Sequence, residues 1–471
     1  MDGALVLNGV KSRGILPSGL REKVLEGIRP TRLQLSILRR LYHIVKDALE
    51  ACEDLKLLSP RYRVELVGSA AKGTLLRDKW EIDVFLLLDA PRGEIKRLGE
   101  EILRSCLGGR LPYYFKYSEH PYATVSLMGM QADIVPAPLA VDPREAMGVE
   151  RTPFHTRYVR SRLEEEPWLV DDILLFKSFL KGVGVYGAET RVGGFSGYLA
   201  EVLVIHYRGF EEAVKAASSW RPPVMIDTTG GKADFGMLAR RYPDSPMIVP
   251  DPVDPSRNTA ASVTLKRLSE LVHAANLFMR KPSQKFFHAF QPRNPCIKPL
   301  PGVMVVMVGD YSNHPPDAIW GRIKRIGERL FRAARARGYP ALSYAFYTDE
   351  ATEAAVYIHM ESPSRYHIEA RPGPPPWESE RAVRFTEKRL GEGGWVWVGE
   401  DGSLSGARLY KGKAAVDIER ALETLPLPPG TRMYRVIVCP STGRCGFPSQ
   451  LEALRDPTPP WVRYVLEDCR S

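Results

Sequence analysis

The sequence predicts an α+β protein of several domains, with a small mixed α/β head, a mainly helical neck, an α/β body and a tail. The chain has 471 residues, which is too long for one compact core. Short alternating strands and amphipathic helices mix in the first 150 residues, and a mainly helical pattern follows. A proline-rich break from Pro292 to Pro301 then precedes a second pattern of strand, helix, strand and strand.

The expected domain boundaries follow these changes of pattern. We expect a head at 1–150, a helical neck at 151–290, a body at 291–365, a tail at 366–430, and a C-terminal part at 431–471 that returns to the body. In the head, alternation predicts strands at 63–67, 82–88, 122–127 and 131–135, and helical spacing predicts helices at 30–55 and 94–105. In the neck, helices are expected at 167–183, 197–207 and 263–280.

The expected body has strands at 303–308, 343–347 and 355–360, with a helix at 316–337. One face of this helix is apolar, and another carries arginines at the same spacing: Arg322, Arg325, Arg329 and Arg332. A solvated surface would explain these arginines, and so would contact with an RNA backbone. The tail is expected to combine a rigid turn at 372–377, a helix at 378–390 and an aromatic strand at 395–397.

The charge of the chain favours a polyanionic partner. The formal net charge is +10, and nucleic acid is the obvious candidate. Ion-pair networks in a heat-adapted protein are the alternative explanation for so many charged side chains. The N-terminal residues lack the pattern of a secretory signal, and no apolar run approaches eighteen residues. We therefore expect a cytoplasmic protein with no membrane span.

The six cysteines are dispersed and do not have the spacing of a four-cysteine zinc site. Only Cys439 and Cys445 lie close together in the sequence. They could form a loop disulfide, but two free thiols on either side of a turn are the favoured interpretation.

The chemistry is concentrated in residues 67–88. Glu81 and Asp83 are two residues apart in a predicted strand, so both carboxylates lie on one face, and Asp133 lies on another alternating strand. Carboxylate oxygens suit Mg²⁺, and a nucleoside triphosphate supplies further oxygens. The Gly68-Ser69 turn can expose backbone N–H groups to phosphate. Each feature alone has a plain alternative, a solvated strand face or an ordinary loop; together they predict metal-assisted nucleotidyl transfer.

A series of further motifs appears in order along residues 30–290. It comprises His120-Pro121-Tyr122, Asp133-Ile134-Val135-Pro136, Arg151-Thr152-Pro153-Phe154-His155, Tyr186-Gly187-Ala188-Glu189, Gly194-Phe195-Ser196-Gly197-Tyr198-Leu199, and Asp251-Pro252-Val253-Asp254 with Arg257-Asn258. With this series, the chain resembles the class I, archaeal-type CCA-adding enzymes, which are tRNA nucleotidyltransferases of the DNA polymerase beta-like superfamily. Beyond about residue 290 the resemblance is weaker.

The resemblance implies a fold and a set of site residues. The head would have the polymerase beta-like nucleotidyltransferase fold, and Glu81, Asp83 and Asp133 would hold two metal ions, expected to be Mg²⁺. The implied triphosphate contacts are Gly68, Ser69, Lys72, His155, Lys177 and Tyr186. Relatives can carry arginine in place of Lys72. The resemblance therefore implies a positive charge at this position, but not the two parallel hydrogen bonds that an arginine can form. Thr152 would lie near the sugar.

Arg257 resembles the arginine that reads the base in this family. A salt bridge to Asp251 or Asp254 is the alternative for Arg257. The other implied residues have plain alternatives too: an ordinary half-buried histidine for His155, a solvated lysine for Lys177 and core packing for Tyr186.

The implied activity is template-independent addition of C, C and A to the 3′ end of tRNA from CTP and ATP, with release of pyrophosphate. A poly(A) polymerase or an oligoadenylate-type nucleotidyltransferase could use the same head and neck. A noncatalytic RNA-binding protein is a third possibility, which the three carboxylates argue against. The tRNA elbow is expected to lie against the body and tail, and association of two copies is left open.

Overall fold

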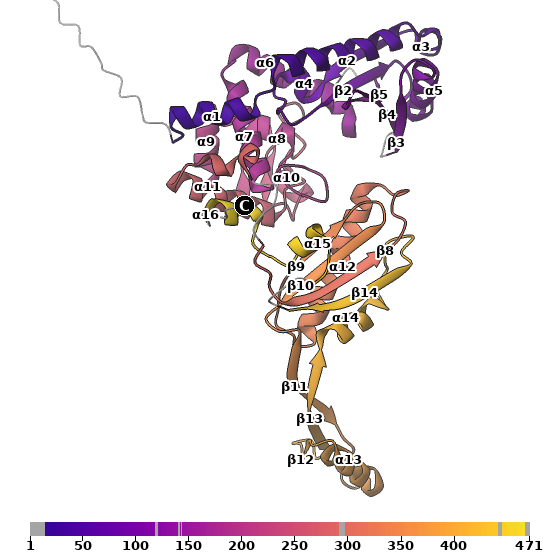
Figure 1. Cartoon of the computed structure of the whole chain (residues 1–471), viewed down its shortest axis with the longest axis vertical. Coiled ribbons are helices and arrows are strands. Elements are labelled where there is room, and N and C mark those ends of the chain that lie inside the picture. Colours follow the sequence, from indigo (N-terminus) through magenta and orange to yellow (C-terminus); the bar gives the residue numbers. More distant parts are fainter. Residues whose placement is uncertain are drawn as a thin grey trace, which may run out of the picture. The chain divides into compact units, whose positions relative to one another are not determined.

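The computed structural model describes residues 15–117, 121–139, 142, 144–291, 297–440 and 445–466. His120, Cys296 and Cys469 lie outside these ranges. The chain forms two compact units, which divide between residues 295 and 296 and again between 459 and 460 (Figure 1). The first unit contains the head and neck, and the second contains the body and tail.

The head is built on a five-stranded sheet with the order β1-β2-β5-β4-β3. Its strands are β1 (Tyr62–Val67), β2 (Glu81–Leu88), β3 (Tyr113–Tyr117), β4 (Pro121–Leu127) and β5 (Met130–Pro138). All neighbours are antiparallel except β2 and β5, which run parallel. Strand β3 was not expected from the sequence. The parallel central pair brings together two strands separated by about forty residues of chain.

Helices cover one face of this sheet and fix which side chains the other face presents. The head helices are α2 (Arg32–Glu50), α3 (Glu53–Leu58), α4 (Gly68–Lys72), η1 (Arg92–Glu94) and α5 (Ile95–Leu107). Leu38, Leu41 and Val45 of α2 are buried against Ile82 and Val84 of β2. Because side chains alternate along a strand, Glu81 and Asp83 face away from this core. A disulfide between Cys52 and Cys106 joins the start of α3 to α5, a link that the sequence did not indicate.

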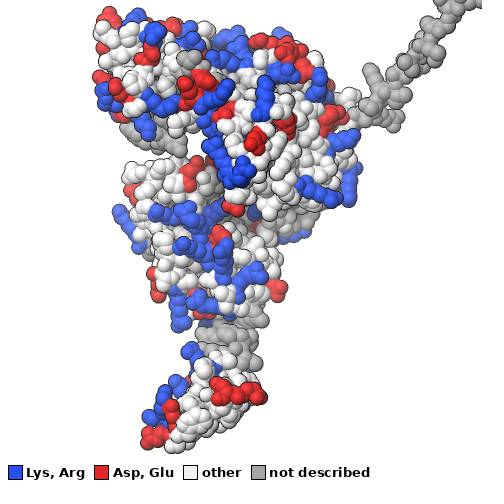
Figure 2. All heavy atoms as spheres, turned by 180° about the vertical axis from the view of Figure 1, so that it is seen from behind, with Lys and Arg blue, Asp and Glu red and all other residues white. Residues whose placement is uncertain are grey.

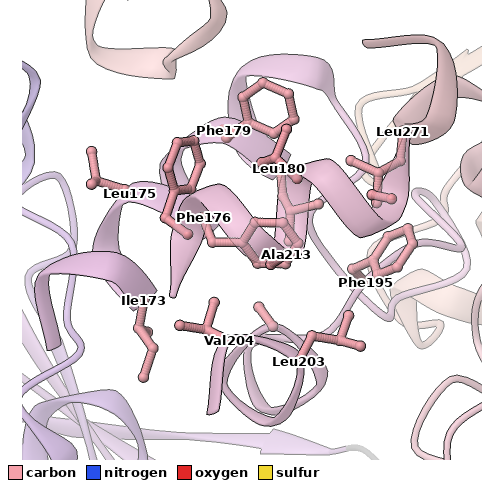
Figure 3. Packing of buried hydrophobic residues seen from close by; sticks show 14 of the residues in the cluster. Ile173, Leu175, Phe176, Phe179, Leu180, Phe195, Leu203, Val204, Ala213 and Leu271 are labelled. Atoms are coloured by element: carbon pink, nitrogen blue, oxygen red, sulfur yellow. The ribbon is translucent and has the colours of Figure 1, made fainter. Parts of the chain in front are cut away.

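The neck packs helices around an aromatic core. It contains α1 (Ser18–Ile28), η2 (Gly148–Arg151), α6 (Thr152–Glu165), α7 (Leu169–Val183), α8 (Gly197–Tyr207), α9 (Phe210–Ala217), β6 (Val224–Met225), α10 (Phe235–Arg241), β7 (Met247–Ile248), α11 (Leu265–Arg280), η3 (Gln284–Phe286) and η4 (His288–Phe290). Figure 3 shows side chains of α7, among them Phe176 and Phe179, packed with Leu203 and Val204 of α8. Both helices are buried on nearly every side, which explains their apolar sequences.

The body is a four-stranded antiparallel sheet with the order β14-β8-β10-β9. Its elements are β8 (Gly302–Val308), α12 (Pro316–Ala336), β9 (Ala341–Thr348), β10 (Glu353–Met360), α14 (Ala414–Leu422), β14 (Met433–Cys439) and α15 (Ser449–Ala453). The expected order of strand, helix, strand and strand is confirmed by β8, α12, β9 and β10. The apolar face of α12 packs on this sheet through Ile319, Ile323, Ile326 and Leu330.

The tail is a three-stranded antiparallel sheet with one helix. It consists of β11 (Ser364–Pro372), α13 (Ser379–Gly391), β12 (Trp395–Val398) and β13 (Leu404–Lys413), with β13 in the centre. Trp395 and Trp397 lie on the edge strand β12, and about half of each side chain is exposed.

Two expectations for the C-terminal part need correction. Strand β14 joins the body sheet as expected, but α16 (Pro460–Leu466) packs in the first unit, where Trp461 contacts Phe286. A buried tryptophan finds its apolar partners in the neck core, and no sequence pattern indicates that return. The interpretation of Cys439 and Cys445 as free thiols is wrong, because the structure joins them in a disulfide. None of the described helices has the length and apolar character needed to cross a bilayer.

Candidate active site

The centre of the candidate site is a pair of carboxylates on the two parallel strands. Asp83 of β2 lies directly opposite Asp133 of β5 in the sheet, and Glu81 lies opposite Gln131. Asp83 and Asp133 are partly buried, whereas Glu81 lies at the exposed start of β2. The sheet therefore places the carboxylates of Asp83 and Asp133 side by side, and Glu81 lies two residues before Asp83 on the same face of β2. Carboxylate oxygens are the ligands that hard cations prefer.

The electrostatics of these carboxylates favour a cation. Burial raises the pKa of Asp83, and the charges of Asp133 and Glu81 raise it further, to about 6. Burial and the same carboxylates also raise the pKa of the neighbouring Tyr122 to about 12. Negative groups held together in partial burial repel one another unless a positive charge offsets them. The donor set thus fits a divalent metal ion in both chemistry and charge.

The carboxylates are held by protein partners in this conformation. The Thr124 hydroxyl donates to Asp133 Oδ1 at 2.6 Å, and Lys116 Nζ lies 3.6 Å from the same oxygen. Glu81 forms an ion pair with Lys79. Within the described ranges, no three His, Cys, Asp or Glu side chains converge into a ready metal cage.

The start of α4 lies against Asp83. Gly68 has a φ of +69°, and a Cβ atom built there would lie 2.1 Å from Asp83 Oδ2. Only glycine allows the backbone to approach Asp83 so closely in this conformation. Ser69 follows in the first turn of α4, and the Gly68 N–H donates to the Thr156 hydroxyl of α6 at 3.2 Å. The expected phosphate turn and metal strand are thus adjacent in space.

Lys72 and Lys177 share one buried carboxylate. Glu201 of α8 is fully buried; its Oε2 accepts from Lys72 Nζ at 2.6 Å and its Oε1 from Lys177 Nζ at 2.7 Å. The Thr74 hydroxyl donates to Oε1 at 2.6 Å. Burial alone would raise the pKa of Glu201, but the two ammonium groups outweigh it and hold the pKa at about 2. The interpretation of Lys177 as a solvated helix lysine is therefore wrong, because its side chain is 2% exposed.

Tyr186 lies near Lys177. A Cβ atom on Gly197 would be 2.9 Å from the Tyr186 hydroxyl and 3.9 Å from Lys177 Nζ, so both groups border that glycine. Burial raises the pKa of Tyr186 above its ordinary range, and the charge of Glu201 adds to this. The hydroxyl therefore remains a protonated donor at neutral pH.

His155 belongs to a second polar group in the neck. Its Nε2 lies 2.8 Å from Asp251 Oδ2, and its ring stacks on Tyr198 with a centroid distance of 3.7 Å. The Tyr198 hydroxyl donates to the other Asp251 oxygen at 2.8 Å. These contacts fix the imidazole near the start of α6, where Thr152 is the first residue. Thr152 is partly buried, and its carbonyl accepts from the Thr156 hydroxyl.

Arg257 does not form the salt bridge considered from the sequence. Its guanidinium has no ion pair with any carboxylate of the described residues; Asp251 binds His155, and Asp254 binds Ser256. A second arginine lies near it. Burial lowers the pKa of Arg151, and the charge of Arg257 lowers it further. The Nε and Nη1 atoms of Arg151 are buried without a hydrogen-bond partner in the structure.

Two protein-family models match the first unit. The nucleotidyltransferase domain matches residues 45–169, and the second domain of tRNA nucleotidyltransferases matches residues 171–288. A CCA-adding enzyme of Aeropyrum pernix is 80% identical over 465 residues, which cover 99% of this chain and all of that protein. The chain belongs to the CCA-adding enzymes. The resemblance drawn from the motifs is thereby confirmed.

A more distant relative and a solved structure show lower similarity. The CCA-adding enzyme of Sulfurisphaera tokodaii is 36% identical over 390 residues, which cover 82% of this chain and 87% of that protein. Among solved structures, a cytoplasmic RNA terminal U-transferase aligns with a TM-score of 0.44 at 13% identity, covering 56% of this chain and 94% of that one. Nucleotidyltransferases of this kind generally use divalent metal ions.

The four arginines of α12 lie in the second unit of this CCA-adding family member. Arg325, Arg329 and Arg332 are exposed, and Arg322 is partly buried with a contact to the Leu427 carbonyl. Arg332 pairs with Glu328 of the same helix at 2.5 Å. Figure 2 shows lysine and arginine side chains gathered on one face of the body, with few acidic ones among them. Three of the four arginines are thus exposed on the surface of the second unit.

Sequence reasoning missed several polar side chains of the first unit. Glu201 is the single carboxylate in the apolar sequence of α8. A lone carboxylate in such a helix indicates a buried charge that needs partners, so the sequence held a signal for this contact. Arg151 begins the motif that ends at His155, but the sequence did not indicate a role for it. Thr124, which binds Asp133, had no sequence signal, because its contact depends on the pairing of β4 with β5.

Proposed function

We propose that this chain adds C, C and A to the 3′ end of tRNA from CTP and ATP and releases pyrophosphate. The observation that carries the chemistry is the register of β2 with β5, which sets Asp83 against Asp133 beside the Gly68 turn. Similarity to the Aeropyrum pernix enzyme over nearly the whole chain supports tRNA as the substrate. A tRNA substrate also favours a cytoplasmic location.

The proposed metal ion is Mg²⁺, held by Asp83 and Asp133 with Glu81 completing the donors. When bound, two such ions would lower the pKa of the attacking 3′-hydroxyl and offset the charge on the triphosphate. The residues present suit this role, because they are acceptor-only oxygens whose mutual repulsion a cation relieves. Thr124 and Lys116 would keep Asp133 oriented beside Asp83.

Other residues of the chain would hold the triphosphate. The turn at Gly68 and Ser69 offers backbone N–H groups and a hydroxyl, and the Tyr186 hydroxyl remains a donor at neutral pH. Lys72 and Lys177 carry two positive charges and share the single negative charge of Glu201. The three groups together therefore have a net charge of about +1, which attracts the phosphates. His155, fixed by Asp251, would contact a phosphate oxygen, and Thr152 would lie near the sugar.

Base selection would fall to the arginine pair in the neck. The Arg257 guanidinium has no ion pair among the described residues, so its donors can turn to the acceptors on a cytosine or adenine edge or to a backbone phosphate. Arg257 lies close enough for its charge to lower the pKa of Arg151. Two neighbouring guanidinium groups, neither of which forms an ion pair with a carboxylate of the described residues, favour an anionic or acceptor-rich ligand.

The tRNA body would be held through its backbone. The exposed arginines of α12 suit the phosphates of the A-form stack that the acceptor stem and T arm form. Because a protein reads such a stack by shape, any structured tRNA would qualify without its anticodon being read. A minihelix of acceptor stem and T arm should then remain a substrate.

One assay tests the proposed function. Purified protein is incubated with a tRNA transcript lacking its CCA end, with each nucleoside triphosphate singly and with all four together, and the product end is sequenced. Addition of C, C and A in that order is expected. Runs of A would indicate a poly(A) or oligoadenylate-type enzyme, and no addition at saturating Mg²⁺ or Mn²⁺ would indicate a noncatalytic RNA-binding protein.

A further inference from the structure

The buried carboxylate of Glu201 joins two parts of the first unit. Lys72 and Thr74 come from α4 and the segment after it in the head, whereas Lys177 and Glu201 come from α7 and α8 of the neck. The side chains are nearly inaccessible, with Lys72 at 7%, Lys177 at 2% and Glu201 at 0% exposure. Buried charges are stable only when they are paired and hydrogen-bonded, so each group depends on the others.

The two lysines are not equivalent in this network. An ammonium group has three N–H donors. Lys177 uses all three, toward Glu201 Oε1 at 2.7 Å, the Thr74 hydroxyl at 3.0 Å and the Thr74 carbonyl at 3.1 Å. Lys72 makes one hydrogen bond in the structure, to Glu201 Oε2 at 2.6 Å. Lys72 therefore keeps donors for a phosphate, and Lys177 could reach one only by giving up an existing bond.

We propose that Glu201 is a positioning residue for the triphosphate, which holds the Lys72 and Lys177 ammonium groups in fixed places between head and neck and leaves Lys72 with donors for the nucleotide. The inference rests on the proposed function, since it assigns the roles of two lysines in that site. Only a carboxylate can accept from both lysines and Thr74 at once. An amide in its place would turn its NH₂ donors toward one ammonium group, and Lys72 would lose its fixed position.

The test is Glu201→Gln in the full chain, with kinetics measured below the melting transition of every variant. The KM for ATP and the KM for CTP should rise together by about tenfold or more, because a charge-assisted contact is lost for both nucleotides. The kcat at saturating nucleotide should change much less, and ATP binding without tRNA, measured by calorimetry, should weaken by the same factor. Glu201→Asp keeps the charge and should restore part of the affinity.

The matched control is Glu166→Gln, a buried carboxylate of the neck that pairs with Arg208. It removes a buried charge without touching either lysine, so its KM values should stay near those of wild type. A folded Glu201→Gln variant with unchanged KM and ATP affinity would overturn the inference, and so would a loss that Glu166→Gln matches. Wild-type protein that adds neither C nor A would instead overturn the proposed function.

Discussion

Gly68→Ala should inactivate the enzyme while leaving it folded. The added Cβ would lie 2.1 Å from Asp83 Oδ2, where ordinary contacts begin at 3.4 Å, so the carboxylate must move by about 1.3 Å. A displacement of about 1 Å at a reacting centre can lower the rate on the order of 100-fold, and we expect a fall of that size in kcat. The positive φ of +69° adds backbone strain of about 1–2 kcal/mol.

Gly73→Ala is the control that separates strain from contact. Gly73 has a φ of +74°, and a Cβ atom there would meet nothing within 4 Å. Its loss of stability should therefore resemble that of Gly68→Ala, without the loss of rate. The assay follows incorporation of labelled CMP and AMP into a tRNA lacking its CCA end, beside thermal unfolding of each variant. Equal activity of the two variants would show that the approach of Gly68 to Asp83 does not matter for catalysis.

The remaining predictions concern the carboxylates, base selection, RNA binding and pH. Asp133→Ala should abolish addition of both C and A in a folded protein, because it removes an oxygen donor that both steps share; near-normal incorporation at saturating Mg²⁺ would refute this. Arg257→Ala should impair discrimination among the four nucleoside triphosphates, measured by competition, more than it lowers stability; unchanged selectivity would leave Arg257 without a role in reading the base. Replacing the four arginines of α12 by glutamine should weaken tRNA binding and reduce its salt slope by up to about four, while ATP binding stays intact; an unchanged slope would exclude this face. The pKa of Glu201 lies near 2 in the fold against an ordinary 4.5, so its contribution to stability is present above pH 4.5 and is lost as the pH falls toward 2. The free energy of unfolding of the wild-type protein should therefore fall by on the order of 3 kcal/mol over that range, and that of Glu201→Gln should lack this fall. An identical pH profile for the two proteins would contradict the pairing of Glu201 with the lysines.

The sequence alone determined which side chains share one face of an element. The alternation of Glu81, Ile82 and Asp83 fixes two carboxylates on one side of a strand, because side chains in a strand alternate strictly. In α12, helical spacing likewise separates the buried isoleucines from the arginines, so its two faces could also be predicted from the sequence. Such local periodicity needs no knowledge of the partner strand or helix. It therefore predicted these elements and their exposed sides.

Only the tertiary structure decided which distant residues meet. The register that sets Asp83 against Asp133 depends on how β2 and β5 pack beneath the same helices. The sharing of Glu201 by Lys72 and Lys177, the approach of Arg151 to Arg257 and the return of α16 to the neck have the same origin. Periodicity within an element says nothing about its partner, whereas a buried charge or tryptophan is stable only where packing supplies one. The faces of the elements are thus local properties, and the site is a property of the packed chain.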